Sequence, residues 1–216
     1  MMMELQIENN FFNLSFYPVF ESYYSDNGKY VEPETRSWFL KNLSEQDIIF
    51  DVGAHIGLYS ILFSQKTSYV YSFEPTDTYE NYLIKNLKSN NIDSVKTEKV
   101  AFGNKIGNLQ EKIYKIWGQD PSEEYFDFTT LDHYTSVNEI IPTYIKIDAD
   151  GYDYEILLGG KNLLQNNTII VCVEINHALE TRGYNSNHIF DFMNSIGYTN
   201  FQVLDNENFF FKKIDG

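Results

Sequence analysis

A glycine-containing turn and a later acidic residue are the part of this sequence best suited to holding a cofactor. Gly53 and Gly57 lie in residues 51–57 (DVGAHIG), between an apolar run and a helical pattern. Gly53 allows a sharp turn and a close approach of a ligand to the backbone, and Gly57 lets a helix start close to its neighbours. Glu74 ends the next apolar run, 21 residues after Gly53, where a carboxylate can accept hydrogen bonds from both hydroxyls of a ribose. The pair predicts an adenosine-containing ligand.

The spacing of the two glycines distinguishes between adenosine cofactors. Gly-x-x-x-Gly lacks the Gly-x-Gly-x-x-Gly pattern that cradles a pyrophosphate, and S-adenosylmethionine carries no phosphate. A nicotinamide-dependent sugar-modifying enzyme would usually also need a Tyr-x-x-x-Lys pair, but no Tyr of this chain has Lys four residues on. The sequence therefore favours S-adenosylmethionine. A purely structural turn between a strand and a helix is the alternative.

A second group of reactive residues follows two later apolar runs. Asp148 and Asp150 come directly after one run, and Glu174 ends another, with His177 three residues on. An oxygen nucleophile needs a base, a metal or both, which makes Asp148 and His177 catalytic candidates. Carboxylates suit Mg²⁺, so Asp148, Asp150 and Glu174 form a candidate metal site. The alternative is a metal-free site in which Asp148 contacts the cofactor and Glu174 is held by Lys146 or by backbone.

The elements that carry these residues are predicted from the apolar runs. Strands are expected at 48–52, 69–73, 95–102, 144–148 and 168–175, and a closing hairpin at 198–204 and 208–212. Helical spacing of apolar residues lies between these strands. The alternation predicts an α/β fold with a doubly wound, mostly parallel, Rossmann-like seven-stranded sheet and an antiparallel hairpin at one edge. Such sheets bind ligands beyond the carboxyl ends of their strands.

The other segments carry weaker patterns. Residues 1–46 are expected to form an N-terminal extension, irregular up to a turn at 25–28 and helical near 35–42, packed on a domain of residues 47–216. Residues 107–130 show little regularity, and 119–124 suggest an exposed loop. Cys172 lies in an apolar run and is expected in the core, and Lys146 alternates with isoleucines and is expected to be a buried partner of an acid.

Several motifs, taken together, resemble the FkbM family of methyltransferases. They are residues 30–33 (YVEP), 51–57 (DVGAHIG), 73–75 (FEP), 130–132 (TLD) and 145–153 (IKIDADGYD). The resemblance covers about residues 30 to 177. It implies a class I methyltransferase fold and O-methylation of sugars, polysaccharide precursors or polyketide-type products. The chain departs from the family where His55 replaces a usual Asn, and where Asp150 and Asp153 stand at positions that are commonly Glu.

The residues and the resemblance together give an expected function and site. We expect an S-adenosylmethionine-dependent O-methyltransferase that acts on a hydroxyl of a sugar, a glycan precursor or a related small molecule. Cofactor binding is assigned to Glu32, Asp51, Gly53, His55, Gly57, Glu74, Ala101 and Asp148. Asp132 either holds the loop under the adenine or faces the acceptor. The alternative function is a domain that binds a cofactor or a partner without catalysis.

Charge and composition limit the partners. A formal net charge of −15 over 216 residues repels phosphate backbones, so no nucleic-acid partner is expected. The sequence shows neither a secretory leader nor a run of ~20 apolar residues, so we expect a cytoplasmic protein without a membrane span. The resemblance leaves room for a homo-oligomer, because active sites of the family are often completed by neighbouring subunits.

Overall fold

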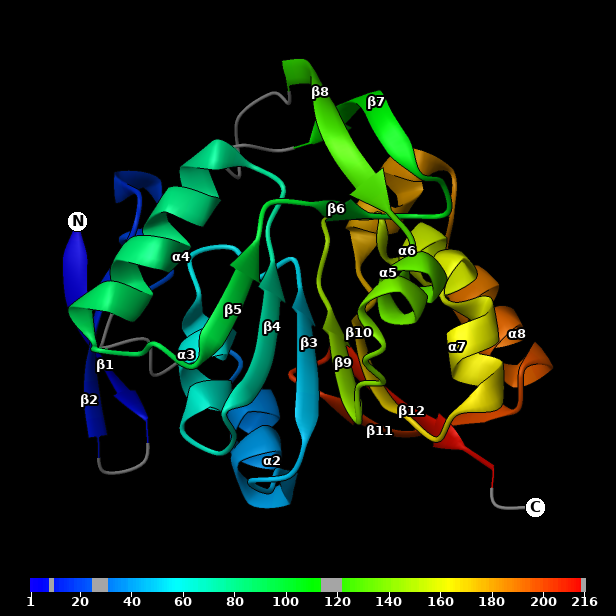
Figure 1. Cartoon of the computed structure of the whole chain (residues 1–216), viewed down its shortest axis with the longest axis horizontal. Helices are drawn as coiled ribbons and strands as arrows, with labels where there is room; N and C mark the ends of the chain where they lie inside the picture. The colour runs from blue at the N-terminus through cyan, green and yellow to red at the C-terminus, as the bar shows by residue number, and fades with distance from the viewer. Residues whose placement is uncertain (8–9, 25–30, 114–121, 215–216) are drawn as a thin grey trace.

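The computed structural model describes residues 1–7, 10–24, 31–113 and 122–214, and its centre is a seven-stranded sheet (Figure 1). In spatial order the strands are β11 (Tyr198–Leu204), β12 (Asn208–Lys213), β10 (Ile170–Glu174), β9 (Tyr144–Ile147), β3 (Ile48–Val52), β4 (Tyr69–Phe73) and β5 (Val95–Glu98). The strands from β10 to β5 pair in parallel, and β12 is antiparallel to both of its neighbours. The predicted sheet and its edge hairpin are confirmed.

Helices cover both faces of this sheet, as Figure 1 shows. They are α2 (Pro33–Asn42), α3 (Leu58–Ser64), α4 (Asp77–Ser89), α5 (Leu131–Asn138), α6 (Asp153–Gly159), α7 (Lys161–Asn166) and α8 (Ser186–Ser195), with the short 3₁₀ helices η1 (Pro18–Phe20) and η2 (His177–Arg182). α2, α3 and α4 lie on one face, and α5 to α8 lie on the other. Helices on both faces make the fold doubly wound, as predicted.

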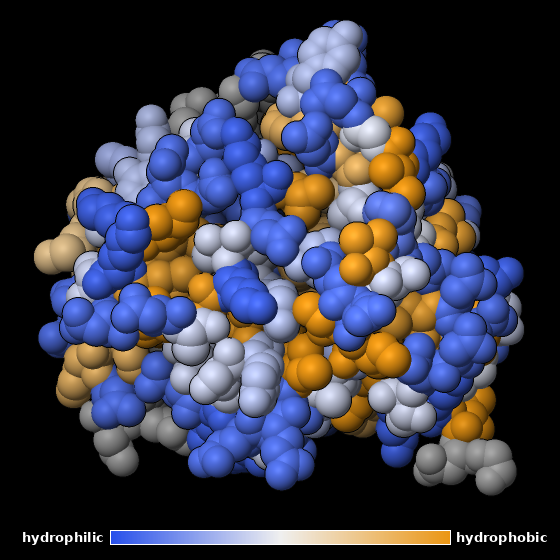
Figure 2. Space-filling view, viewed as in Figure 1, coloured by the Kyte–Doolittle hydropathy of each residue, from blue (hydrophilic) through white to orange (hydrophobic). Residues whose placement is uncertain are grey.

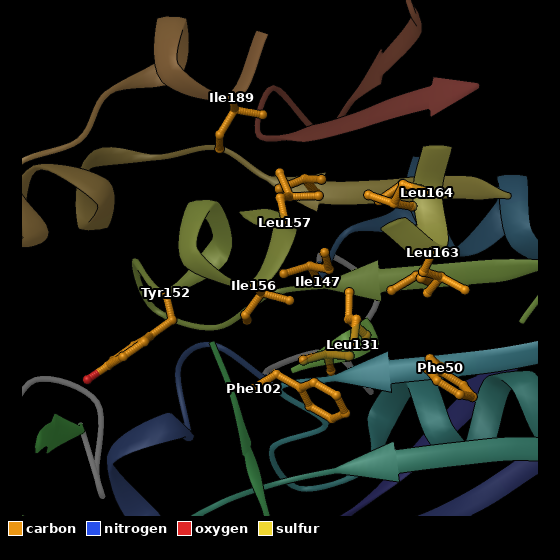
Figure 3. Packing of buried hydrophobic residues seen from close by; sticks show 14 of the residues in the cluster. Phe50, Phe102, Leu131, Ile147, Tyr152, Ile156, Leu157, Leu163, Leu164 and Ile189 are labelled. Carbon is orange, nitrogen blue, oxygen red and sulfur yellow. The ribbon is translucent and has the colours of Figure 1, made fainter. Parts of the chain in front are cut away.

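Alternation along the strands supplies two hydrophobic cores. On β3, Phe50 and Val52 join the cluster under α5 to α8, whereas Ile49 joins the cluster under α2 to α4. Successive side chains of a strand point to opposite faces, which explains why the central runs are apolar throughout. Figure 3 shows the first cluster. Cys172 is buried in the second cluster, as expected.

A second, three-stranded sheet corrects two expectations. The strand expected at 95–102 is split, because β5 ends at Glu98 and β6 (Ala101–Phe102) pairs with β8 (Ser122–Thr129). The segment expected to be irregular forms β7 (Gly107–Ile113), antiparallel to β8. Of the expected loop at 119–124, residues 122–124 belong to β8, and the rest lies outside the described residues. Most of β7 is exposed and polar, so the sequence carries no hydrophobic alternation there.

The N-terminal segment is more regular than expected. β1 (Met2–Ile7) and β2 (Asn10–Ser15) form an antiparallel pair, and α2 confirms the helix expected near 35–42. Leu5, Leu14 and Phe39 share a buried cluster with residues of β3 and α3, so this segment packs on the main sheet. The turn expected at 25–28 lies outside the described residues. The boundary between residues 46 and 47 remains a prediction.

The surface agrees with the strongly acidic composition. The face shown in Figure 2 is mostly hydrophilic, and its apolar residues form separate patches. None of the helices in the described part of the chain is both long and apolar enough to cross a membrane.

Candidate active site

A cavity of about 570 Å³ lies where the carboxyl ends of the parallel strands meet. Its walls are formed by residues that follow β3, β4, β5, β9 and β10, together with part of the N-terminal segment. The expected site residues that line it are Glu32, Asp51, Gly53, His55, Glu74, Ala101, Asp148, Asp150, Glu174 and His177. Its size is within the usual range of about 300–1,000 Å³ for small-molecule sites. The fold thus brings together the residues selected from the sequence, apart from Gly57 and Asp132.

The two glycines have different structural roles. Gly53 has φ +82°, and a Cβ atom there would lie 1.8 Å from the carbonyl oxygen of Asp148. The close approach of the loops after β3 and β9 therefore requires glycine, and a valine would disturb this contact as well as any ligand. Gly57 lies outside the cavity, where a Cβ atom would come 2.5 Å from Leu83 of α4. Its role is the packing of α3 against α4.

Glu74 presents a buried carboxyl group to the cavity. Its side chain is 5% exposed and accepts hydrogen bonds from the backbone N–H of His55 (3.1 Å), from the backbone N–H of Thr76 (2.9 Å) and from the Thr76 hydroxyl (2.6 Å). Burial raises the pKa of Glu74 to about 7, although these hydrogen bonds favour its charged form. A ligand that donates further hydrogen bonds would stabilise the carboxylate.

His55 is held in place by two aromatic rings. Its imidazole meets the ring of Phe20 at 5.1 Å and that of Tyr79 at 4.0 Å between centroids, both edge to face. Burial lowers the pKa of His55 to about 4, so the ring is neutral at physiological pH. This arrangement fits the expected positioning role and gives the ring no proton to exchange near neutrality.

Lys146 supplies a positive charge beneath the cavity. It is 2% exposed, its Nζ lies 2.6 Å from Oδ2 of Asp148, and Nζ is also 4.3 Å from the centre of the Tyr59 ring. Burial alone would lower the pKa of Lys146, but Asp148, Glu32 and Asp51 raise it above its usual value. Burial likewise opposes ionisation of Asp148, but Lys146 holds its pKa below the usual range. The expected buried partner of an acid is therefore present.

Asp51 is fixed on the same face of the sheet. It is 2% exposed and accepts a hydrogen bond from the Ser60 hydroxyl at 2.7 Å, and Ser60 is in turn hydrogen bonded to Ser72. Burial raises its pKa to about 6. Asp51 pairs in register with Lys146 on β9, so it contributes negative charge to the Lys146 environment.

Three carboxyl groups converge above this lysine. Glu32, Asp148 and Glu174 each place an oxygen so that all three lie within 4.8 Å of one another. Glu32 comes from the start of α2 and accepts a hydrogen bond from Asn208 of β12. Burial and the nearby Asp148 raise the pKa of Glu174 far above its usual value, because the cluster disfavours another negative charge.

The ligand set expected for a metal differs from this cluster. Asp150 is exposed in a left-handed conformation (φ +47°) and takes no part in the three-carboxylate group, and Glu32 takes its place. The backbone explains this, because Asp153 accepts hydrogen bonds from the N–H groups of Ala149 and Gly151, both at 3.0 Å, and so fixes the turn that carries Asp150. His177 is also exposed, on the rim of the cavity at the start of η2.

Comparison with known proteins identifies the family of this chain. The model of the methyltransferase FkbM domain matches residues 51–199. The chain belongs to the FkbM methyltransferase family. No curated protein matches the sequence. The family and the fold support an S-adenosylmethionine-dependent methyltransferase of class I.

Solved structures share the fold of this FkbM-family protein at low identity. Methyltransferase FkbM from Methylobacillus flagellatus KT is 16% identical with a TM-score of 0.57, over 80% of this chain and 44% of that chain. This chain therefore spans less than half the length of that protein. M. jannaschii TYW2 in complex with AdoMet is 13% identical (TM-score 0.53; 99% and 87% covered), and a putative rRNA-methylase from Clostridium thermocellum is 13% identical (TM-score 0.54; 84% and 96% covered).

The structure also decides the role that the sequence left open for Asp132. Its carboxylate accepts hydrogen bonds from the backbone N–H groups of Asn162 (3.1 Å) and Leu163 (2.7 Å) in the first turn of α7. Asp132 is absent from the cavity wall and therefore stabilises the helix terminus.

One wall of the cavity was not predicted from the sequence. Phe20, Tyr23 and Tyr24 of the N-terminal segment line it, although Glu32 was the one residue of that segment expected at the site. The aromatic composition of residues 11–24 is the one signal that could have suggested this, since Tyr and Phe rings suit pocket walls.

Proposed function

We propose that this FkbM-family chain transfers a methyl group from S-adenosylmethionine to an oxygen of a hydroxyl-bearing small molecule, such as a sugar or a glycan precursor. One observation carries the proposal: a single cavity holds the buried Glu74 on one side and the Lys146–Asp148 pair on the other. A ribose-binding acid and a second charged centre are what a cofactor and a polar acceptor would each require.

The cavity fits the cofactor chemically. Val100, Ala101 and Phe102 give an apolar wall for an adenine ring, and the Glu74 carboxyl lies between this wall and the Gly53 loop. Glu74 would accept hydrogen bonds from the ribose hydroxyls, and the negative charge near Asp148 suits the positively charged methionine part. When bound, S-adenosylmethionine supplies a methyl group on a sulfonium, with no need for a phosphate-binding loop.

The protein's own residues would orient the acceptor and remove its proton. Lys146 keeps Asp148 ionised, so Asp148 can accept a hydrogen bond from the acceptor hydroxyl but is a weak base. His177 lies on the rim of the same cavity, where it can take the proton and pass it to solvent. Asp148 is thus proposed to orient the nucleophile and His177 to act as the base.

We favour a metal-free form of this site over a Mg²⁺ site. The three clustered carboxyl groups could ligate a hard cation, but Nζ of Lys146 already lies 2.6 Å from Asp148 and balances its charge. Activity in excess EDTA should equal activity with added Mg²⁺. Loss of turnover in EDTA that Mg²⁺ restores would instead establish the carboxylates as metal ligands.

Two other functions use the same fold. Nucleic-acid methylation is disfavoured by the net charge of −15, because phosphate binding rests on Lys and Arg. A domain that binds the cofactor without catalysis would keep Glu74 and the Gly53 loop but would show no turnover.

The decisive experiment has two steps. Calorimetric titration of the protein with S-adenosylmethionine tests the cavity assignment. Release of S-adenosylhomocysteine is then measured with hydroxylated acceptors and, for comparison, with RNA. Binding followed by turnover on hydroxyl acceptors is the expected result. Turnover on RNA, or binding that no acceptor converts into turnover, would contradict the proposal.

A further inference from the structure

A smaller and more polar cavity of about 310 Å³ adjoins the main one. It lies between β7 and β8 on one side and the start of α6 and the end of η2 on the other. Among the described residues, those that line it carry charged, amide or hydroxyl groups, whereas the main cavity also has aliphatic walls. Lys112, Asp150 and Tyr152 line both cavities, so a bound molecule could extend from one into the other.

A fixed guanidinium group forms part of this polar cavity. Arg182 makes a two-point contact with Glu155 (Nε at 2.6 Å and Nη2 at 3.0 Å), and its Cζ lies 3.7 Å from the centre of the Tyr152 ring. Its Nη1 lies 3.6 Å from Glu111, which leaves donor capacity on that nitrogen. Because the stack and the two-point contact hold the group rigid, it offers a hydrogen-bond donor in a defined place.

Acceptors surround this donor. Glu111 accepts a hydrogen bond from the Tyr152 hydroxyl at 3.0 Å. Figure 3 shows that this hydroxyl is directed away from the hydrophobic cluster. Gln110, Glu123 and Asp150 are exposed on the cavity wall. A carboxylate can accept hydrogen bonds from two neighbouring hydroxyl groups at once, and an amide side chain can both donate and accept hydrogen bonds. This mixture of donors and acceptors matches a ring that carries several hydroxyl groups.

The charges of the polar cavity disfavour an anionic ligand. Three carboxylates (Glu111, Glu123 and Asp150) face two cations (Lys112 and Arg182), and Arg182 is already neutralised by its contact with Glu155. A phosphate or carboxylate on the ligand would be repelled by these carboxylates, which lowers the affinity for an anionic acceptor relative to a neutral one.

We propose that this polar cavity holds the acceptor, and that the acceptor is a polyhydroxylated group without an anionic substituent, such as a neutral sugar ring. The inference rests on the proposed methyltransferase function and adds the place and the charge of its acceptor. Asp150 lines both cavities and Asp148 lines the main one, so a ring in the polar cavity would lie next to the cavity that holds the centre that we assign to methyl transfer.

The test is a panel of probes with saturating S-adenosylmethionine. Methyl glycosides of neutral hexoses and deoxyhexoses are compared with the matching uronic acids and sugar 1-phosphates, and S-adenosylhomocysteine release is measured. Turnover is expected on neutral glycosides at least about tenfold above that on the anionic partners. Equal or better turnover on the anions, or none on any probe by a protein that binds the cofactor, overturns this inference. Failure to bind S-adenosylmethionine would instead overturn the proposed function.

A charge reversal locates the effect in the polar cavity. Glu123→Lys should raise the ratio of anionic to neutral turnover about tenfold and leave the Kd for S-adenosylmethionine unchanged. Glu45→Lys is the matched control, because it makes the same change of charge at an exposed residue that lines neither cavity. Equal shifts in both variants, or a shift in neither, would show that the acceptor does not lie there.

Discussion

The Glu74 carboxylate is buried and held by the protein, yet it can still accept hydrogen bonds from a ligand. Both carboxylate oxygens accept hydrogen bonds from the protein, Oε1 from Thr76 and Oε2 from the backbone N–H of His55. Each oxygen keeps lone-pair capacity for a further donor. The protein bonds set the orientation of the group but do not fully offset its burial, which is why its pKa remains raised.

Replacing this carboxylate by an amide should weaken cofactor binding. Glu74→Gln is expected to cost about 1.5–3 kcal/mol of affinity for S-adenosylmethionine, because charge-assisted hydrogen bonds to ribose become neutral ones. Calorimetry on the folded variant measures the loss. Glu98→Gln, which alters the end of the neighbouring strand β5 outside the cavity, should bind normally. An unchanged Kd for Glu74→Gln would exclude the ribose assignment.

The pH dependence of binding follows from the same group. Burial raises the pKa of Glu74 to about 7, and the ionised form is the better acceptor for ribose hydroxyls. Affinity should therefore hold above pH 7 and fall by up to about tenfold per pH unit below it. Titrations at pH 5.5, 6.5 and 8 measure this slope. Glu74→Gln should flatten it, and a slope that survives in the variant would assign the titration to another group.

At the scale of elements, loops and helix termini decide which acids reach the site. Asp153 and Asp132 both follow strands or strand-like runs of the sequence, yet each binds backbone N–H groups of the protein itself. Asp153 shapes the turn that presents Asp150, and Asp132 stabilises the start of α7. An acid near a strand end can therefore bind the protein's own backbone instead of a ligand.

Removal of the Asp132 carboxylate should affect stability and not binding. Asp132→Ala is expected to lower the free energy of unfolding by about 1–2 kcal/mol, because two backbone N–H groups of α7 lose their partner. Urea unfolding measures the loss, and calorimetry should give an unchanged Kd for S-adenosylmethionine. A large loss of affinity in a fully folded variant would place Asp132 in the cofactor site after all.

At the scale of the whole molecule, several buried acids make the folded state more stable at mildly acidic pH than near neutral pH. Burial raises the pKa of Asp51 to about 6 and that of Asp153 to about 7, each above its value in an unfolded chain. The folded state therefore holds more protons than the unfolded state between about pH 4 and 7. The stability that these groups contribute is present below pH 4 and is lost as pH rises through 6 to 7.

Unfolding experiments can test this directly. The urea midpoint should be higher at pH 5.5 than at pH 8, and the net charge of −15 adds repulsion in the same direction at the higher pH. Asp153→Asn should reduce the difference, since it removes one titrating group while the amide oxygen still accepts one of the two backbone hydrogen bonds. A midpoint that rises with pH would show that other groups dominate the linkage.

The sequence by itself determined the central sheet, its hairpin and most of the acidic residues that line the cavity. Residues 169–173 are apolar on both faces, as buried parallel strands require, and the acids that end the parallel strands, such as Asp148 and Glu174, must meet at one edge. These are consequences of local pattern and of chain direction. The exclusion of a pyrophosphate loop likewise followed from the spacing of Gly53 and Gly57 alone.

Only the tertiary structure decided which acids converge and which partners the strands choose. Glu32 joins Asp148 and Glu174 because α2 packs on a face of the sheet and begins near the carboxyl ends of its strands, a contact between residues distant in the chain. β6 does not continue the strand that begins at Val95, because it pairs with β8 instead. Pairing partners and side-chain convergence depend on long-range packing, whereas the pattern of residues along a segment reports only which of its faces are buried.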